Sequence, residues 1–301
     1  MFATLKGHAK IIELRIGHGV LVNAIVTDES TAIMFATLKG HAKIIELRIG
    51  HGVLVNAIVK YESTAIMFAT LKGHAKIVEL LIEHGALVNA IVTDESTAIM
   101  FASLKGHAKI VELRIGHGAL VNPIVTDEST AIMFATLKGH AKIIELRIGH
   151  GVLVNAIVKY ESTAIMFATL KGHAKIVELL IEHGALVNAI VTDESTAIMF
   201  ASLKGHAKIV ELRIGHGALV NPIVTDESTA IMFASLKGHA KIVELRIGHG
   251  ADVIHKNKNG QTSLLLASVN GHSETVQLLL DSNAKANDVH IKGWTSFNVG
   301  S

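Results

Sequence analysis

The apolar positions of this chain repeat every 33 residues, and this period controls most of what the sequence indicates. Methionine stands at positions 1, 34, 67, 100, 133, 166, 199 and 232, and Leu265 takes the same place in the next copy. Three modules together form a longer repeat, because residues 34–132 are identical to residues 133–231. Periods of about 20 to 50 residues are typical of solenoids, in which each module buries its apolar surface against its neighbours.

One module, residues 26–58, predicts two short helices followed by a loop. Thr31 is a candidate N-cap for the first helix, which is apolar nearly all round and is therefore expected to be buried on most sides. Gly40 and His41 separate this helix from a second one with a single broad apolar face, and Gly52 is expected to end that helix in a left-handed conformation. Neither helix is long enough to be stable alone, so stacking must supply the missing contacts.

The phase of the repeat divides the chain into a partial module at 1–25, eight full modules at 26–289, and the start of a further module at 290–301. The full modules begin at residues 26, 59, 92, 125, 158, 191, 224 and 257. Because both ends fall inside a module, we expect the chain to be a fragment of a longer protein.

The pattern of the module is T-A-I-M-F-A-x-L-K-G-H-x-x-I-[IV]-E-L-x-I-x-H-G-[VA]-L-V-N-[AP]. This module resembles the ankyrin repeat. Ankyrin repeats typically read G-x-T-P-L-H-x-A-A-x-x-G-H-x-x-I-V-x-L-L-L-x-x-G-A-D-V-N-A. The match is closest at 250–253, 259–262, 271–272 and 278–280. The resemblance implies an all-α solenoid of stacked helix-turn-helix repeats, each with a β-hairpin finger. It also implies a concave face of finger tips and first helices, a protein-binding role and no cofactor.

Four residues depart from the family pattern within one module. Ala32 replaces a proline, and Met34 replaces a histidine that would be tied to the cap threonine. Glu29 replaces the hairpin glycine that favours positive φ, and Val26 replaces the aspartate beside it. We therefore expect the β-hairpin fingers to be short or irregular.

Arg48 lies in the middle of the apolar face of the second helix, and arginine recurs there at 15, 114, 147, 213 and 246, whereas 81 and 180 are leucine. We predict that the aliphatic stem packs while the guanidinium reaches water. Two alternatives stay open. The arginines form a basic stripe for an acidic partner, or each is an unpaired buried charge that weakens the core.

Composition narrows the functional classes. The net charge is only +2, which provides no field for nucleic acid or anionic lipid, and the absence of cysteine removes disulfides and thiol catalysis. No apolar run approaches the roughly 20 residues of a membrane span, and the first residues do not form a secretory signal. We therefore expect a cytoplasmic location, with no nucleic-acid partner and no direct membrane insertion.

The 19 histidines fall mostly into two series that begin at His8 and His18 and advance one module at a time. Equivalent residues in stacked helices are about 8–10 Å apart, too far to share a zinc ion, so we predict no metal site. The first series matches the glycine-histidine turn of the ankyrin repeat, and the resemblance implies that these are structural turn histidines. The recurring Asp28-Glu29 pair is predicted to be a solvated loop tip. No motif for acyl transfer, phosphate binding or metal-dependent hydrolysis occurs, so we expect neither enzyme activity nor a small-molecule ligand.

The finger tips are the predicted recognition site, because the copies differ there. Most inner tips carry Thr-Asp and two carry Lys-Tyr, with the only two tyrosines of the chain. Tyrosine is a common interface anchor. We predict partner contacts from Asp28, Lys60, Tyr61, Asp94, Asp127, Lys159, Tyr160, Asp193 and Asp226.

The predicted function is a scaffold or adaptor that binds a protein through its finger tips and first helices. An alternative is a structural spacer or cytoplasmic stalk segment of a larger protein, membrane proteins included, with no specific ligand. Near-identical surfaces on every module favour that alternative, since repeat proteins that bind a specific partner usually vary their contact residues from module to module.

Overall fold

The computed structural model of the chain describes residues 2–23, 31–59, 62–91, 96–122, 130–158, 161–190 and 195–286. These ranges contain 18 helices and no strand, only isolated β-bridges. The predicted all-α repeat solenoid is therefore confirmed. Contacts within the chain divide it into two compact units, Met1–Leu153 and Val154–Ser301, and each is described by itself.

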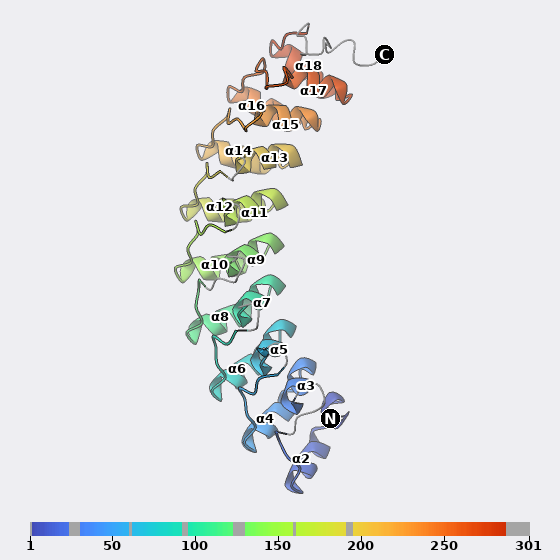
Figure 1. Ribbon diagram of the computed structural model, residues 1–301, viewed down its shortest axis with the longest axis vertical. Coiled ribbons are helices and arrows are strands. Elements are labelled where there is room, and N and C mark those ends of the chain that lie inside the picture. The colour runs from blue at the N-terminus through green and yellow to red at the C-terminus, as the bar shows by residue number, and fades with distance from the viewer. Residues whose placement is uncertain are drawn as a thin grey trace. The chain divides into compact units, whose positions relative to one another are not determined.

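The first unit consists of helix pairs stacked in two layers (Figure 1). The first helix of each pair packs on the first helix of the next, and the second helices stack in the same way. The first helices are α1 (Phe2–Leu5), α3 (Ala32–Lys39), α5 (Ala65–Lys72), α7 (Ala98–Lys105) and α9 (Ala131–Lys138). The second helices are α2 (Ala9–Gly17), α4 (Ala42–Gly50), α6 (Ala75–Glu83), α8 (Ala108–Gly116) and α10 (Ala141–Gly149).

The second unit repeats this arrangement with four pairs (Figure 1). Its first helices are α11 (Ala164–Lys171), α13 (Ala197–Lys204), α15 (Ala230–Leu236) and α17 (Ser263–Val269). Its second helices are α12 (Ala174–Glu182), α14 (Ala207–Gly215), α16 (Ala240–Gly248) and α18 (Ser273–Asp281).

The turn inside each pair is fixed by the glycine-histidine step. Gly40 has φ +79°, and the His41 amide donates to the Ala36 carbonyl at 2.9 Å. A Cβ at Gly40 would also lie 2.9 Å from Cε1 of His74 in the next module, so the site requires glycine for close approach as well as for its conformation. At the end of the second helix Gly52 has φ +75°. The predicted turn and C-cap are therefore confirmed.

Thr31 occupies the predicted N-cap position, but the predicted hydrogen bond was wrong. Its backbone is extended, yet its hydroxyl makes no cap hydrogen bond, because the Met34 amide bonds the backbone carbonyl of Thr31 at 3.1 Å instead. The hydroxyls of the equivalent threonines are likewise buried and have no partner among the described residues; these are Thr64, Thr97, Thr130 and Thr163. Among the described threonines at this position, the side-chain cap forms before α17, where Thr262 Oγ1 accepts the Leu265 amide at 3.2 Å.

An asparagine clamps the loop to the next module after each of the second helices α2, α4, α6, α8, α10, α12 and α14. The Asn56 side chain donates to the Gly85 carbonyl at 2.8 Å and accepts from the Leu87 amide at 2.9 Å. The same pair of bonds recurs from Asn23, Asn89, Asn122, Asn155, Asn188 and Asn221. Consecutive loops are thereby held at one fixed spacing within each unit.

Candidate functional site

Eight of the nine predicted finger-tip residues lie outside the described ranges: Asp28, Lys60, Tyr61, Asp94, Asp127, Lys159, Tyr160 and Asp193. The ninth, Asp226, is exposed in the turn before α15. Its carboxylate accepts hydrogen bonds from the Ser228 amide at 2.9 Å and the Ser228 hydroxyl at 3.0 Å. Asp226 therefore helps to shape its own turn while it stays accessible to a partner.

A row of phenylalanines lies along the first helices. Each is half-buried, and the row comprises Phe35, Phe68, Phe101, Phe134, Phe167, Phe200 and Phe233. Phe134 packs against Met100 of the preceding first helix and Ala131 of its own. The expectation that the first helix is buried on most sides is confirmed, and the large side chains that stay partly accessible are the phenylalanine and the leucine three residues after it, as with Phe35 and Leu38.

In the second unit two of these rings border a hollow of about 220 Å³, lined by Ser195, Met199, Phe200, Leu203 and Phe233. Three of the lining residues come from α13 and one from α15. The lining is mostly apolar, so the hollow suits an apolar side chain of a partner.

Exposed isoleucines lie close to the start of the first helices. Isolated bridges join Ile91 to Thr97, Ile190 to Thr196, and Ile223 to Thr229, which precedes α15. These isoleucine side chains and their equivalents Ile58 and Ile157 are between 49% and 67% exposed. Sequence reasoning missed both the isoleucines and the phenylalanines as site residues. The unusually apolar loop V-L-V-N-A-I-V was the available signal for the isoleucines.

The prediction for the second-helix arginines was wrong. Arg114, Arg147, Arg213 and Arg246 are 0% exposed, and Arg48 is 6% exposed, so their guanidinium groups do not reach water. A basic surface stripe at these five positions is equally contradicted.

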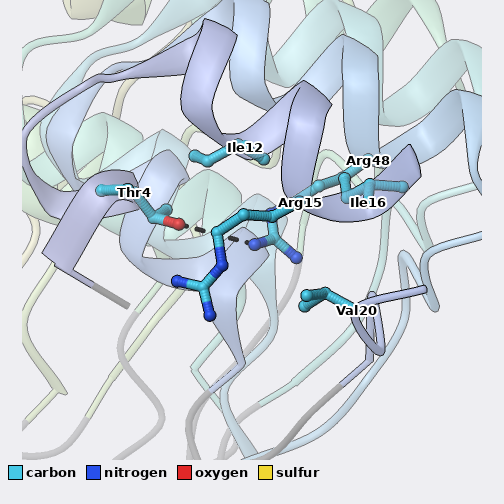
Figure 2. A pocket seen from close by; sticks show the side chains of 7 residues that line it. Thr4, Ile12, Arg15, Ile16, Val20 and Arg48 are labelled. Atoms are coloured by element: carbon cyan, nitrogen blue, oxygen red, sulfur yellow. Dashed lines mark hydrogen bonds between the residues drawn. The ribbon is translucent and has the colours of Figure 1, made fainter. Parts of the chain in front are cut away.

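The loop of the preceding module accounts for this burial. Nη1 of Arg48 donates to the Val22 carbonyl at 2.9 Å, and Nη2 lies 3.5 Å from the Thr4 hydroxyl (Figure 2). The other four arginines donate in the same way to the carbonyls of Val88, Val121, Val187 and Val220. The Nε of each of the five has no partner among the described residues.

Arg15 differs from these five, because its side chain is exposed. Figure 2 shows its guanidinium beside that of Arg48 in a hollow of about 70 Å³, whose apolar walls include Ile12, Ile16 and Val20.

Loss of solvation lowers the pKa of Arg114, Arg147, Arg213 and Arg246 to about 10. Each guanidinium therefore stays protonated near neutral pH, and none has an acidic partner within salt-bridge distance among the described residues. Backbone carbonyls compensate only part of the desolvation of such a cation. The alternative of a buried, incompletely paired charge describes the observed geometry best.

The first histidine series has the structural turn role expected of it, and the second makes a contact within its own helix. In the first, Nε2 of His41 lies 3.2 Å from the Leu5 carbonyl, and the same contact recurs one module further along at several positions. In the second, Nδ1 of His18 lies 2.7 Å from the Leu14 carbonyl in its own helix. The described residues hold no cluster of three or more metal-binding side chains.

Two further findings bear on the class of protein. None of the helices in the described ranges has the length and apolar character that a membrane crossing requires. A family model described as ankyrin repeats (3 copies) matches the chain at residues 1–92, 148–224 and 198–292. A search of curated proteins finds no match.

Proposed function

Because the chain belongs to the ankyrin repeat family, we propose that it is an adaptor that binds a protein partner through its first helices and finger tips. Ankyrin repeats generally mediate protein–protein interaction, and proteins built from them are typically non-catalytic. The observation that carries the proposal is the half-buried phenylalanines on the first helices of each unit, together with the exposed isoleucines that bridges join to the residues before α7, α13 and α15.

These side chains suit recognition for a physical reason. Aromatic and aliphatic groups that are already partly ordered lose little conformational entropy when a partner covers them. In the second unit, Phe200 and Phe233 border the apolar hollow, and Ile223 is joined by a bridge to the residue before α15. Asp226 lies three residues further along in the same turn and adds a charged group beside this apolar surface.

Site-specific photo-crosslinking in the full chain tests the surface. A photoreactive phenylalanine analogue at Phe200 is expected to capture the partner, whereas the same analogue at Glu211, exposed on α14, is not. For the captured partner, Phe200→Ala with Phe233→Ala is expected to weaken binding at least about tenfold, as for interface anchors, while Lys208→Ala leaves it unchanged. Equal capture at Phe200 and Glu211, or unchanged affinity of the double variant, would contradict the proposal.

The finger tips are tested separately with the two tyrosines. Tyr61→Ala with Tyr160→Ala is expected to weaken the same complex, because tyrosine provides large contact area at low entropic cost. An unchanged dissociation constant would remove the tyrosines from the site and leave the first helices as the binding surface.

A structural spacer is the second candidate function, and one observation favours it. Residues 34–132 and 133–231 are identical, so the modules present the same surface twice. The spacer predicts that no partner is captured at stoichiometric amounts from any position on the first helices, and the adaptor predicts the opposite.

A further inference from the structure

The hollow drawn in Figure 2 brings two guanidinium groups together, and we call it the arginine hollow. Arg15 reaches it from α2 and Arg48 from α4, so two consecutive modules each contribute one cation. Neither arginine has an acidic partner within salt-bridge distance among the described residues. Two like charges at one small site repel each other, so this arrangement is most stable when a negative charge lies between them.

Arg48 retains unused hydrogen-bond donors. Of the several N–H groups of its guanidinium, one donates to the Val22 carbonyl at 2.9 Å and another lies 3.5 Å from the Thr4 hydroxyl, the outer limit of a hydrogen bond. Its Nε is buried without a partner among the described residues, and loss of solvation lowers the pKa of Arg48. A negatively charged acceptor would supply the stabilisation that a single carbonyl does not.

Arg15 makes the pair accessible to a ligand. Of the six arginines in the chain it is the exposed one, and its guanidinium has no hydrogen-bond partner among the described residues. Arg114 occupies the equivalent position in α8, yet it is 0% exposed and donates to the Val88 carbonyl of the preceding loop. Arg15 therefore offers a planar set of N–H donors that the buried arginines cannot offer.

The size and the walls of the arginine hollow limit what it can hold. Its volume is about 70 Å³, and since one water needs about 10–15 Å³ of such space, it takes a group of about five non-hydrogen atoms. Ile12, Ile16 and Val20 form apolar walls beside the two cations. A carboxylate on a short aliphatic chain suits both features, because its oxygens accept the guanidinium hydrogen bonds while its carbons contact the walls.

From these observations we propose that the arginine hollow is a carboxylate-binding site, in which Arg15 and Arg48 hold the anion and the apolar walls hold its aliphatic part. The Val22 carbonyl already fixes Arg48, so binding orders mainly the side chain of Arg15. The site shares no residue with the phenylalanines, isoleucines and finger tips proposed to bind a protein partner, so the two proposals fail independently.

Proton–nitrogen correlation NMR of the arginine side chains in the full chain tests the site. Sodium propionate, exchanged against sodium chloride at constant ionic strength, is expected to shift the Nε–H signals of Arg15 and Arg48 and to reach saturation in the millimolar range, as for other very small ligands. The signals of the other four arginines are expected to stay in place, because their side chains are 0% exposed.

Two variants and two further probes make the result specific. Arg15→Gln removes the accessible cation and is expected to abolish the saturable shift of Arg48, whereas Lys6→Gln removes an exposed cation outside the hollow and is expected to leave the affinity unchanged. Propionamide, which has the shape of propionate without its charge, is expected to cause no shift. Inorganic phosphate is expected to bind about tenfold more weakly than propionate, because it has no carbons to contact the walls.

Each part of the proposal has an outcome that overturns it. Equal shifts with propionamide would show that the hollow binds through apolar contact alone, and equal affinity for phosphate would show that the site does not select carboxylates. Shifts that rise linearly with propionate concentration, that include the four buried arginines, or that persist in Arg15→Gln would overturn the site itself.

Discussion

The turn before α17 and the turn before α15 follow the same backbone path with very different side chains. Before α17 the Gly260 amide donates to the Asn257 carbonyl at 2.8 Å, and before α15 the Glu227 amide donates to the Val224 carbonyl at 2.7 Å. The Asn257 side chain accepts hydrogen bonds from the Asn259 and Gln261 amides, whereas the side chain of Val224 has no acceptor atom. Gly260 has φ +72° at no steric cost, but Glu227 has φ +62° with a side chain.

The second helices of these two modules, α18 and α16, also differ in their side chains. Leu279 in α18 and Arg246 in α16 occupy equivalent buried positions, each 0% exposed. The module that begins at 257 thus fills its core with an aliphatic group, caps α17 through Thr262, and supports its turn through Asn257. The module before it keeps the same fold without these three features. The comparison teaches that contacts with neighbouring modules impose the path of the backbone, while local side chains adjust its energy.

The largest expected effect comes from exchanging the buried cation. Arg246→Leu should raise the free energy of unfolding by about 1–4 kcal/mol, because an aliphatic side chain avoids the desolvation of an incompletely paired charge. Leu279→Arg in α18 is the matched reverse change and should lower it by at least about 3 kcal/mol. Urea unfolding of the full chain, followed by circular dichroism, measures both.

A loss of stability in Arg246→Leu would contradict this comparison. It would mean that the hydrogen bonds from Arg246 to the Val220 carbonyl and the Ser202 hydroxyl outweigh the desolvation of the guanidinium. Arg246→Ala is the wrong control, since it adds a cavity to the loss of charge.

The next prediction concerns how the stability difference between Arg246→Leu and the wild type depends on pH. Burial lowers the pKa of Arg246 from its ordinary, higher value to about 10, so between these two values the unfolded chain binds more protons than the folded one. Stability of the wild type should therefore rise with pH in that window relative to Arg246→Leu. The gap between the two unfolding midpoints should be constant from pH 7 to 9 and should narrow above pH 10. A gap that stays constant to pH 11 would show that the folded arginine keeps its ordinary pKa.

Sequence reasoning predicted what lies within one module and failed where two modules meet. Thr31, Gly40 and Gly52 mark the helix ends correctly because their conformations are local. The apolar face around Arg48 was also correct, but its periodicity does not reveal that a loop 26 residues earlier covers the guanidinium and offers it a carbonyl. The candidate site was predictable only as a region, since the exposure of the phenylalanines depends on the neighbouring first helices.

Replacing the threonine before a first helix should have a smaller effect on stability, and its sign should differ between Thr262 and Thr97. Thr262→Val should cost about 1 kcal/mol, because the Leu265 amide loses its acceptor. Thr97→Val should be neutral or stabilise by up to about 1 kcal/mol, because it replaces a buried hydroxyl without a partner by a methyl of similar shape. Equal losses in the two variants, measured by thermal unfolding, would indicate that the Thr97 hydroxyl is hydrogen-bonded in solution.

The smallest expected effect concerns the turn with which the comparison began. Glu227→Gly should stabilise the chain by about 0.5–1 kcal/mol. The strain energy that a side chain causes at this positive φ is larger than the free-energy cost of the extra conformational entropy that glycine has in the unfolded state. Gly260→Glu should lower the free energy of unfolding by a similar amount, and Gly260→Asn should lower it less, since asparagine tolerates the left-handed region better. Stability measurements on the three variants separate strain from side-chain support, because the Asn257 bonds remain in both variants at 260. If Glu227→Gly leaves the unfolding midpoint unchanged, the backbone at 227 is not strained, and the two turns differ in their side-chain hydrogen bonds rather than in strain.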